Sequence, residues 1–183
     1  MPGVISLLPE PFASAVQRLW GSMHREFGIP MGYPGAVPHI TFHLGARDAE
    51  PGAAGVVEAV AKRTVPFSIT TAGLGVFGGP EPVVHLAVAR SPQVARLAEE
   101  LESALAAAGY PTTDPYFTPD RWTPHITIAH RNLAGIELGP LLAWLVSQPL
   151  NWEIPLSTLS VARETELSAD VLATFPLSGR AAG

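Results

Sequence analysis

The sequence predicts a fold of helices and strands arranged as two pseudo-symmetric lobes with one cleft between them. Two observations support this prediction. The tetrapeptide Pro-His-Ile-Thr occurs twice, at residues 38–41 and 124–127. Around both copies the same order recurs, namely helix, histidine-bearing strand, helix, strand and strand. We interpret this as an internal duplication whose copies pack about a pseudo-twofold axis, approximately residues 1–89 and 90–178 of one domain.

The elements of the first lobe follow from hydrophobic periodicity and from the Pro and Gly residues at their ends. A short apolar strand at 4–8 ends at Pro9. Apolar residues at helical spacing then predict a helix that starts near Pro11 and closes at Gly28. The other elements expected here are a loop at 30–37, the first histidine strand at 38–44, a helix at about 53–63, and strands at 67–74 and 83–89 around a turn at 78–80.

The second lobe begins with a helix-capping pattern. Ser91 is a good N-cap, and Pro92 suits the first helical turn, after which an apolar stripe continues until Gly109. A polar loop at 110–123, the second histidine strand at 124–129, a short helix at 140–148 and two or three strands within 151–175 are expected to follow, with a disordered tail at 179–183.

The composition excludes several classes of function. The formal net charge of −5 argues against a broad basic surface for nonspecific nucleic-acid binding. The absence of cysteine excludes disulfides and thiolate chemistry. Neither a signal peptide nor a stretch long enough to cross a bilayer is present, so we expect a cytoplasmic protein without membrane contact, and a monomer.

Each histidine strand has period two, with apolar side chains on one face and an imidazole and a hydroxyl on the other. His39 and Thr41 share such a face, as do His125 and Thr127. Neighbours on one face are roughly 6.5 to 7 Å apart, so a His and a Thr can contact one phosphate together. His43 falls on the face of His39 and Thr41, and we expect it to line the cleft too.

Two histidines that face each other across a polar cleft suit paired acid–base catalysis, because the ordinary imidazole pKa lies near neutrality. The neutral ring accepts a proton from the attacking hydroxyl or water, and the charged ring donates one to the leaving oxygen. Threonine hydroxyls donate hydrogen bonds to the non-bridging phosphate oxygens. This chemistry needs no metal or cofactor, and we expect none.

The two strands resemble the motifs of the two-histidine (2H) phosphoesterase superfamily, in which His and Thr or Ser flank one residue and an apolar residue follows. Residues 39–42 and 125–128 both fit this pattern. The chain looks most similar to the branch of bacterial 2′-5′ RNA ligases and RNA 2′,3′-cyclic phosphodiesterases. The resemblance implies an α+β, bilobal fold with an antiparallel-rich sheet and two helices in each lobe. It also implies hydrolysis of a 2′,3′-cyclic phosphate to a 2′-phosphate, with 2′-5′ ligation as the reverse reaction in some members.

The sequence departs from this family at one position. Many members carry an arginine five residues after the second motif histidine, where this chain has His130, which we expect on the opposite face. Arg121 or Arg131 would then supply the cation. His85 lies in an apolar strand, which favours a core or cleft-edge histidine over a catalyst. Four aromatic residues flank the motifs and either stack a base or close the loop ends, namely Tyr33, Tyr116, Phe117 and Trp122.

We therefore interpret the chain as a metal-independent phosphoesterase acting on a cyclic phosphate at an RNA 3′ end or on a nucleotide. His125 is assigned as the base and His39 as the acid, while Thr41 and Thr127 hold the phosphate. Two alternatives stay open. A nucleotide-binding module would use the same cleft without turnover and would need mainly the threonines and the stacking aromatic residues. A phosphodiesterase could instead act on a small non-RNA metabolite, since the acidic charge mildly favours a small substrate over long RNA.

Overall fold

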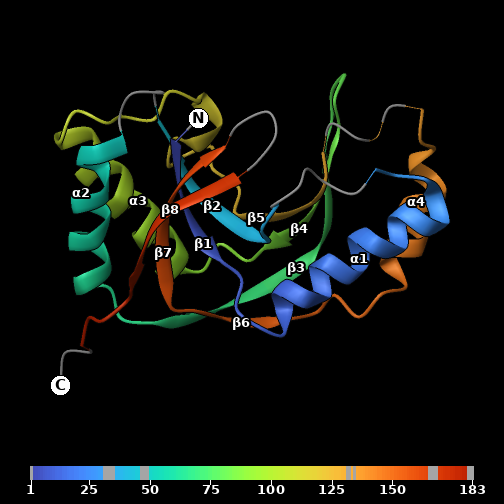
Figure 1. Ribbon diagram of the computed structural model, residues 1–183, viewed down its shortest axis with the longest axis horizontal. Coiled ribbons are helices and arrows are strands. Elements are labelled where there is room, and N and C mark those ends of the chain that lie inside the picture. The colour runs from blue at the N-terminus through green and yellow to red at the C-terminus, as the bar shows by residue number, and fades with distance from the viewer. Residues whose placement is uncertain are drawn as a thin grey trace.

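The computed structural model describes residues 2–30, 36–45, 50–130, 133, 135–164 and 169–180. Helices and strands mix as the sequence predicts, and the α+β class is confirmed (Figure 1). The described elements, in chain order, are β1 (Pro2–Leu7), α1 (Phe12–Phe27), β2 (His39–Leu44), α2 (Glu50–Arg63), β3 (Phe67–Phe77), β4 (Val83–Val88), α3 (Pro92–Ala107), the 3₁₀ turn η1 (Pro115–Phe117), β5 (His125–Ala129), α4 (Leu138–Val146), β6 (Glu153–Leu156), β7 (Thr158–Glu164) and β8 (Ala169–Pro176).

The predicted order of elements is confirmed, and most differences lie at the ends. Helix α2 begins at Glu50 rather than near residue 53. The Pro-Gly pair at 51–52 led to the later predicted start, although the first turn of a helix tolerates proline. Strand β3 continues to Phe77, beyond the predicted end at residue 74. Its register against β4 shifts near Gly73, whose φ of 91° suits an irregularity of this kind.

The strands form one eight-stranded sheet in the order β6-β3-β4-β5-β2-β1-β7-β8, and all the described pairs are antiparallel. The two histidine strands, β5 and β2, are the central pair. On one side, β1 and β7 follow β2, and on the other side β4 and β3 follow β5. Strands from both sequence repeats therefore lie in each half of the sheet, so the two repeats share one continuous sheet.

The helices lie at the two ends of this sheet, with α2 and α3 at one end and α1 and α4 at the other (Figure 1). Helix α2 contacts β7 and β8, α3 contacts β2, and α1 contacts β5. The indole N–H of Trp20 on α1 donates a hydrogen bond to the carbonyl of Ile128 on β5, at 2.9 Å. These contacts bury the apolar residues of both histidine strands, which are Ile40, Phe42, Ile126 and Ile128.

The C-terminal segment returns to the end of α2 after β8. Ser178 donates its backbone N–H to the carbonyl of Ala61, and Gly179 donates to the carbonyl of Thr64, at 3.1 and 3.0 Å. Backbone hydrogen bonds therefore hold the start of the segment for which the sequence predicts disorder, and residues 181–183 lie outside the described part of the chain.

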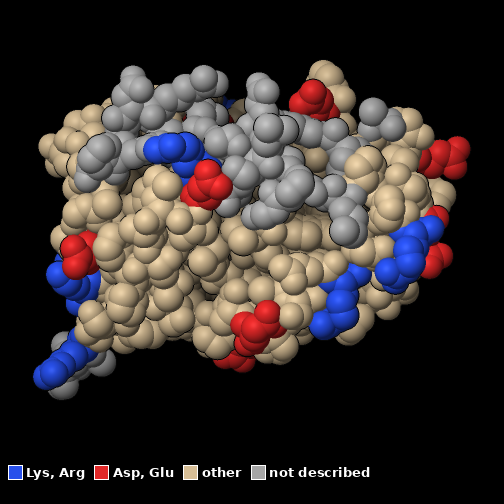
Figure 2. Space-filling view, viewed as in Figure 1, with Lys and Arg blue, Asp and Glu red and all other residues tan. Residues whose placement is uncertain are grey.

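Charged side chains are sparse on the face drawn in Figure 2. Lys and Arg occur there in small groups near Asp and Glu, with uncharged residues between them. This distribution agrees with the small number of charges in the sequence, 11 basic and 16 acidic residues. Within the part of the chain that the structure describes, no helix has both the length and the apolar character needed to cross a membrane.

Candidate active site

The candidate site is built on the pairing of the two histidine strands. Strands β2 and β5 are antiparallel, and Ile40 is paired with Ile126. This register sets Thr41 opposite His125 and His39 opposite Thr127, with Cβ atoms of opposed residues roughly 4.5 to 5.5 Å apart. All four side chains are half-buried, whereas the two paired isoleucines are 2% and 0% exposed on the other face. Two imidazoles and two hydroxyls therefore form a compact four-residue group.

The two imidazoles are oriented in the same way. The Nδ1–H of His39 donates to the carbonyl of Val37 at 2.6 Å, and the Nδ1–H of His125 donates to the carbonyl of Thr123 at 2.8 Å. In each case the acceptor is two residues upstream. A carbonyl can only accept, so this bond assigns the proton of a neutral ring to Nδ1 and makes Nε2 the basic nitrogen.

The backbone around each motif repeats the same hydrogen bond. The carbonyl of Pro38 accepts from the N–H of Leu8, which follows β1, and the carbonyl of Pro124 accepts from the N–H of Val88 at the end of β4, both at 2.9 Å. Because a motif proline has no N–H to donate, its carbonyl is what ties the start of each histidine strand to its neighbour. The two copies of the motif are thus anchored to their neighbouring strands in equivalent ways.

A β-bulge follows the threonine in each motif. In β2, Thr41 pairs with Ile5 and His43 with Val4, so Phe42 is the extra residue. In β5, Thr127 and Ala129 pair with consecutive residues of β4, so Ile128 is the extra residue. The period of two therefore holds from the histidine to the threonine and is broken immediately afterwards.

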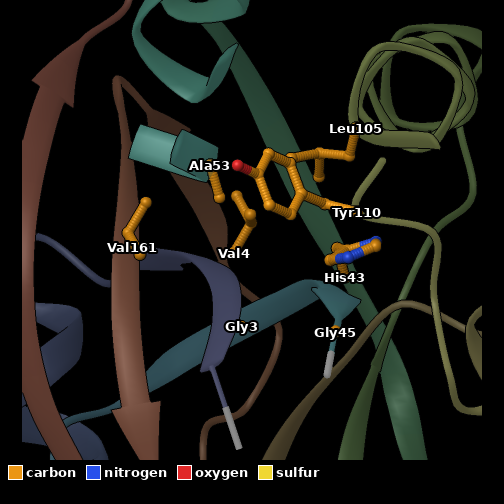
Figure 3. A pocket seen from close by; sticks show the side chains of 8 residues that line it. All are labelled: Gly3, Val4, His43, Gly45, Ala53, Leu105, Tyr110 and Val161. Atoms are coloured by element: carbon orange, nitrogen blue, oxygen red, sulfur yellow. The ribbon is translucent and has the colours of Figure 1, made fainter. Parts of the chain in front are cut away.

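The bulge explains why the prediction for His43 is wrong. His43 does not share the surface of His39 and Thr41. It is 3% exposed, and its Nδ1 lies 2.8 Å from Oε2 of Glu102 on α3. Figure 3 shows the ring near Tyr110 in a small pocket beneath α2 and α3. Burial lowers the pKa of His43, and the hydrogen bond and charge of Glu102 oppose this only in part.

Comparison with known proteins identifies the family of the chain. A model of the 2′-5′ RNA ligase superfamily matches residues 8–166. The chain belongs to the 2′-5′ RNA ligase superfamily. No curated protein matches the chain.

Solved structures similar to this superfamily member include TT0787 of Thermus thermophilus, with a TM-score of 0.66 and 19% identity over 98% of this chain and 99% of that one. A structure described as a phosphoesterase has a TM-score of 0.61 and 16% sequence identity, over 97% of both chains. The structure of E. coli LigT complexed with phosphate has a TM-score of 0.58 and 15% sequence identity, over 97% of this chain and 96% of LigT. At these identities the structures establish the fold.

A third imidazole adjoins the group in this superfamily member. His85 on β4 is 4% exposed, and its ring centroid lies 5.1 Å from that of His125. Phe77 on β3 stacks on His85 at 4.1 Å and meets His125 edge-on at 4.9 Å. Burial lowers the pKa of His85 as well. Sequence reasoning missed Phe77, and placed His85 only as a core or cleft-edge residue, because the pairing of β4 with β5 is a long-range contact.

The surroundings of His125 strongly disfavour its charged form. Its pKa is lowered to about 4, mainly by burial, and further by the charges of His85, His39 and His130. The hydrogen bond to the carbonyl of Thr123 acts in the opposite direction and is outweighed. The ring is therefore neutral near pH 7, with Nε2 able to accept a proton. His130 was expected on the opposite face, yet its charge acts on His125.

Trp122 serves the core of this superfamily member rather than offering a stacking surface. It is 3% exposed, its ring packs 5.2 Å from that of Phe42, and its Nε1–H donates to the carbonyl of Thr41 at 3.0 Å. The indole thereby fixes the backbone of a motif threonine. Of the two roles predicted for Trp122, burial excludes the stacking of a base and agrees with an aromatic side chain that closes the loop end.

The other predicted binding residues have three different outcomes. Tyr116 is 67% exposed, and the guanidinium of Arg121 lies 4.9 Å from its ring centroid, so these two form a cation–π pair on the loop before β5. Phe117 is partly buried against the core. Tyr33 and Arg131 lie outside the described residues.

Among the residues that are described, no group of three or more His, Cys, Asp or Glu side chains is arranged to hold a metal ion.

Proposed function

We propose that the chain is a metal-independent phosphoesterase that hydrolyses a 2′,3′-cyclic phosphate, at an RNA 3′ end or on a nucleotide, to a 2′-phosphate. The observation that carries the proposal is the pair of equivalent histidines. Each directs Nδ1–H to the carbonyl two residues upstream, and each stands beside a threonine of the partner strand. This arrangement offers two proton-transfer groups and two hydroxyl donors around one small anion.

The roles of the two histidines differ in the proposal because their surroundings differ. Burial and three neighbouring imidazoles favour the neutral form of His125, which suits a general base. His39 then supplies the acid. The same site could also take the 5′-hydroxyl of a second RNA in place of water. Its oxygen would bond to phosphorus as the bond from phosphorus to O3′ breaks, with the same two proton transfers, and the RNA ends would be joined by a 2′-5′ linkage.

The proposed reaction is a single displacement at phosphorus. Nε2 of His125 accepts a proton from water as the water oxygen forms its bond to phosphorus. The bond from phosphorus to O3′ breaks, and Nε2–H of His39 gives its proton to O3′. Thr41 and Thr127 donate hydrogen bonds to the non-bridging oxygens, where negative charge increases. The products are a 2′-phosphate and a free 3′-hydroxyl, and the site regains one protonated and one neutral ring by exchange with solvent.

Two findings support a phosphate as the bound group. The family to which the chain belongs is the 2′-5′ RNA ligase superfamily, and LigT, which shares the fold, is complexed with phosphate. The nucleotide-binding module without turnover keeps its place as the competing proposal, since the same hydroxyls would hold a phosphate. A small non-RNA phosphodiester is the third, since the chain carries a net charge of −5.

The test is incubation with the four 2′,3′-cyclic nucleoside monophosphates and with an oligonucleotide that ends in a cyclic phosphate, followed by ³¹P NMR of the product. The expected product is the 2′-phosphate, formed at similar rates by the wild type and by the control His24→Ala on α1, and roughly 10² to 10⁴ times more slowly by His125→Ala. Tight binding of the nucleotides without turnover would instead favour the binding module. If the protein neither binds nor hydrolyses these compounds, the proposed substrate class is wrong.

A further inference from the structure

Three aromatic rings from three strands meet beside the candidate site. His125 on β5 lies next to β4, where it is paired with Ala87. His85, two residues before Ala87, and Phe77 on β3 both contact this ring, at centroid distances of 5.1 and 4.9 Å. The ring of His125 is thus bounded on one side by a cluster whose members come from two further strands.

The position of the His85 ring depends on a glycine. Gly75 on β3 pairs with His85, and a Cβ atom on Gly75 would clash with Nε2 of His85 at 2.4 Å. That separation is far below van der Waals contact, so any side chain at residue 75 would displace the imidazole. Phe77 covers the ring from the same strand, stacked at 4.1 Å with planes 22° apart. Strand β3 thus provides both the space and the cover for His85.

We propose that His85, seated on Gly75 and covered by Phe77, is a positioning residue that fixes the imidazole of His125 and keeps it in the role of proton acceptor. This inference rests on the proposed function for its catalytic meaning. His85 acts through its neighbour in two ways. Its ring limits the tilt of the His125 ring, and a proton on either ring opposes a proton on the other, because two like charges at this spacing repel.

Several groups face His125, and their effects have different signs. His85 on β4, His39 on β2 and His130 after β5 each disfavour its charged form. The carbonyl of Thr123 favours the charged form, while Phe77 contributes apolar surface. His85 also makes a direct ring contact with His125, at a centroid distance of 5.1 Å. Replacement of His85 should therefore change both the orientation of His125 and the pH at which it gains a proton.

The experiment is an NMR titration of the histidine rings in ligand-free protein, which reports the midpoint and the tautomer of His125, combined with kcat and KM on the cyclic nucleotides. His85→Phe keeps a ring that cannot take up a proton, and His85→Ala removes the ring altogether. Gly75→Ala keeps the imidazole but displaces it. Phe77→Leu, at a side chain that is 37% exposed, perturbs the cluster with the least risk to folding. His24→Ala is the matched control on α1.

In the wild type we expect the Nδ1–H tautomer of His125 and a midpoint near the pKa of about 4. All three substitutions of His85 and Gly75 should raise the midpoint, and Phe77→Leu should weaken the tautomer preference. His85→Ala should lower kcat about 10- to 100-fold with little change in KM, as expected for a misplaced catalytic group. His85→Phe should retain more of kcat than His85→Ala, because its ring still packs against His125.

The inference is overturned if His85→Phe and Phe77→Leu both leave the midpoint and tautomer of His125 at their wild-type values. Should buried substitutions fail to fold, Phe77→Leu alone decides by the same readout. A shifted midpoint in a protein that hydrolyses no cyclic phosphate would support the positioning of His125 and contradict the proposed function, so the two failures are distinguishable.

Discussion

Replacement of His125 should make the stability of the protein less dependent on pH. The wild-type ring has a pKa of about 4 in the folded chain, below the ordinary value of 6.5 that it regains on unfolding. Between these two values the unfolded state binds a proton that the folded state does not. Stability conferred by the neutral ring is therefore complete above pH 6.5 and is lost as the pH falls towards 4.

The size of the effect follows from proton occupancy. At pH 5, His125 carries about 0.1 proton in the folded chain and about 0.97 in the unfolded chain. Around pH 5, each unit by which the pH is lowered should thus reduce the free energy of unfolding by about 1 kcal/mol because of this residue alone. His43 adds a slope of the same sign that is common to wild type and variant. His85 also adds a slope of this sign, and its proton uptake is coupled to that of His125, so the variant reports the loss of His125 together with that coupling.

The assay is urea unfolding at intervals between roughly pH 4.5 and 7.5 for the wild type, His125→Asn and the control His24→Ala. Asparagine keeps an N–H near the position of Nδ1–H but cannot titrate. The wild type and the control should share the steeper slope, and the Asn variant should show a slope smaller by about 1 kcal/mol per pH unit. Equal slopes in all three proteins would refute the idea that His125 is held neutral by its surroundings.

Three further predictions concern the rest of the site. Turnover of cyclic phosphate should survive EDTA, because side chains supply both proton transfers; activity lost on chelation and restored by a divalent ion would point to metal assistance. Trp122→Phe should lower the free energy of unfolding by roughly 1 to 3 kcal/mol in urea melts, since it leaves the carbonyl of Thr41 without its donor; unchanged stability would contradict this. His43→Ala should lower the free energy of unfolding by a similar amount, because Glu102 loses its 2.8 Å hydrogen-bond partner. It should leave kcat within about threefold of the wild-type value. A loss of kcat as large as that of a motif histidine variant would show that His43 takes part in catalysis.

The sequence predicts the four-residue group because local periodicity is enough to place it. From His39 to Thr41, and from His125 to Thr127, each strand keeps a period of two, so the shared face can be deduced without knowledge of any partner strand. The roles of these four residues stay predictions. The repeated tetrapeptide also predicts an internal duplication, which stays a prediction, and the carbonyls of Pro38 and Pro124 accept equivalent backbone hydrogen bonds.

What the sequence could not predict depends on contacts between distant segments. His43 leaves the expected face because of a bulge that appears only when β2 pairs with β1. His85 approaches His125 because β4 lies beside β5 in the sheet, and Gly75 makes room from a third strand. Trp122 carries no periodicity that distinguishes a buried indole from an exposed one, and its burial against Phe42 is decided by packing.

The most direct test of the account is the pH dependence of kcat for the wild type, His39→Ala, His125→Ala and the double variant on a 2′,3′-cyclic nucleotide. The account predicts a bell-shaped dependence of kcat on pH for the wild type, with each limb set by an ionisation of the coupled pair. On the acid limb, kcat falls as His125 becomes protonated. Each single variant should lose roughly 10² to 10⁴ in kcat and one limb of the bell, and the double variant should fall well short of the product of these losses. Near-full turnover in either single variant, with both limbs retained, would contradict the assignment of acid–base catalysis to these two histidines.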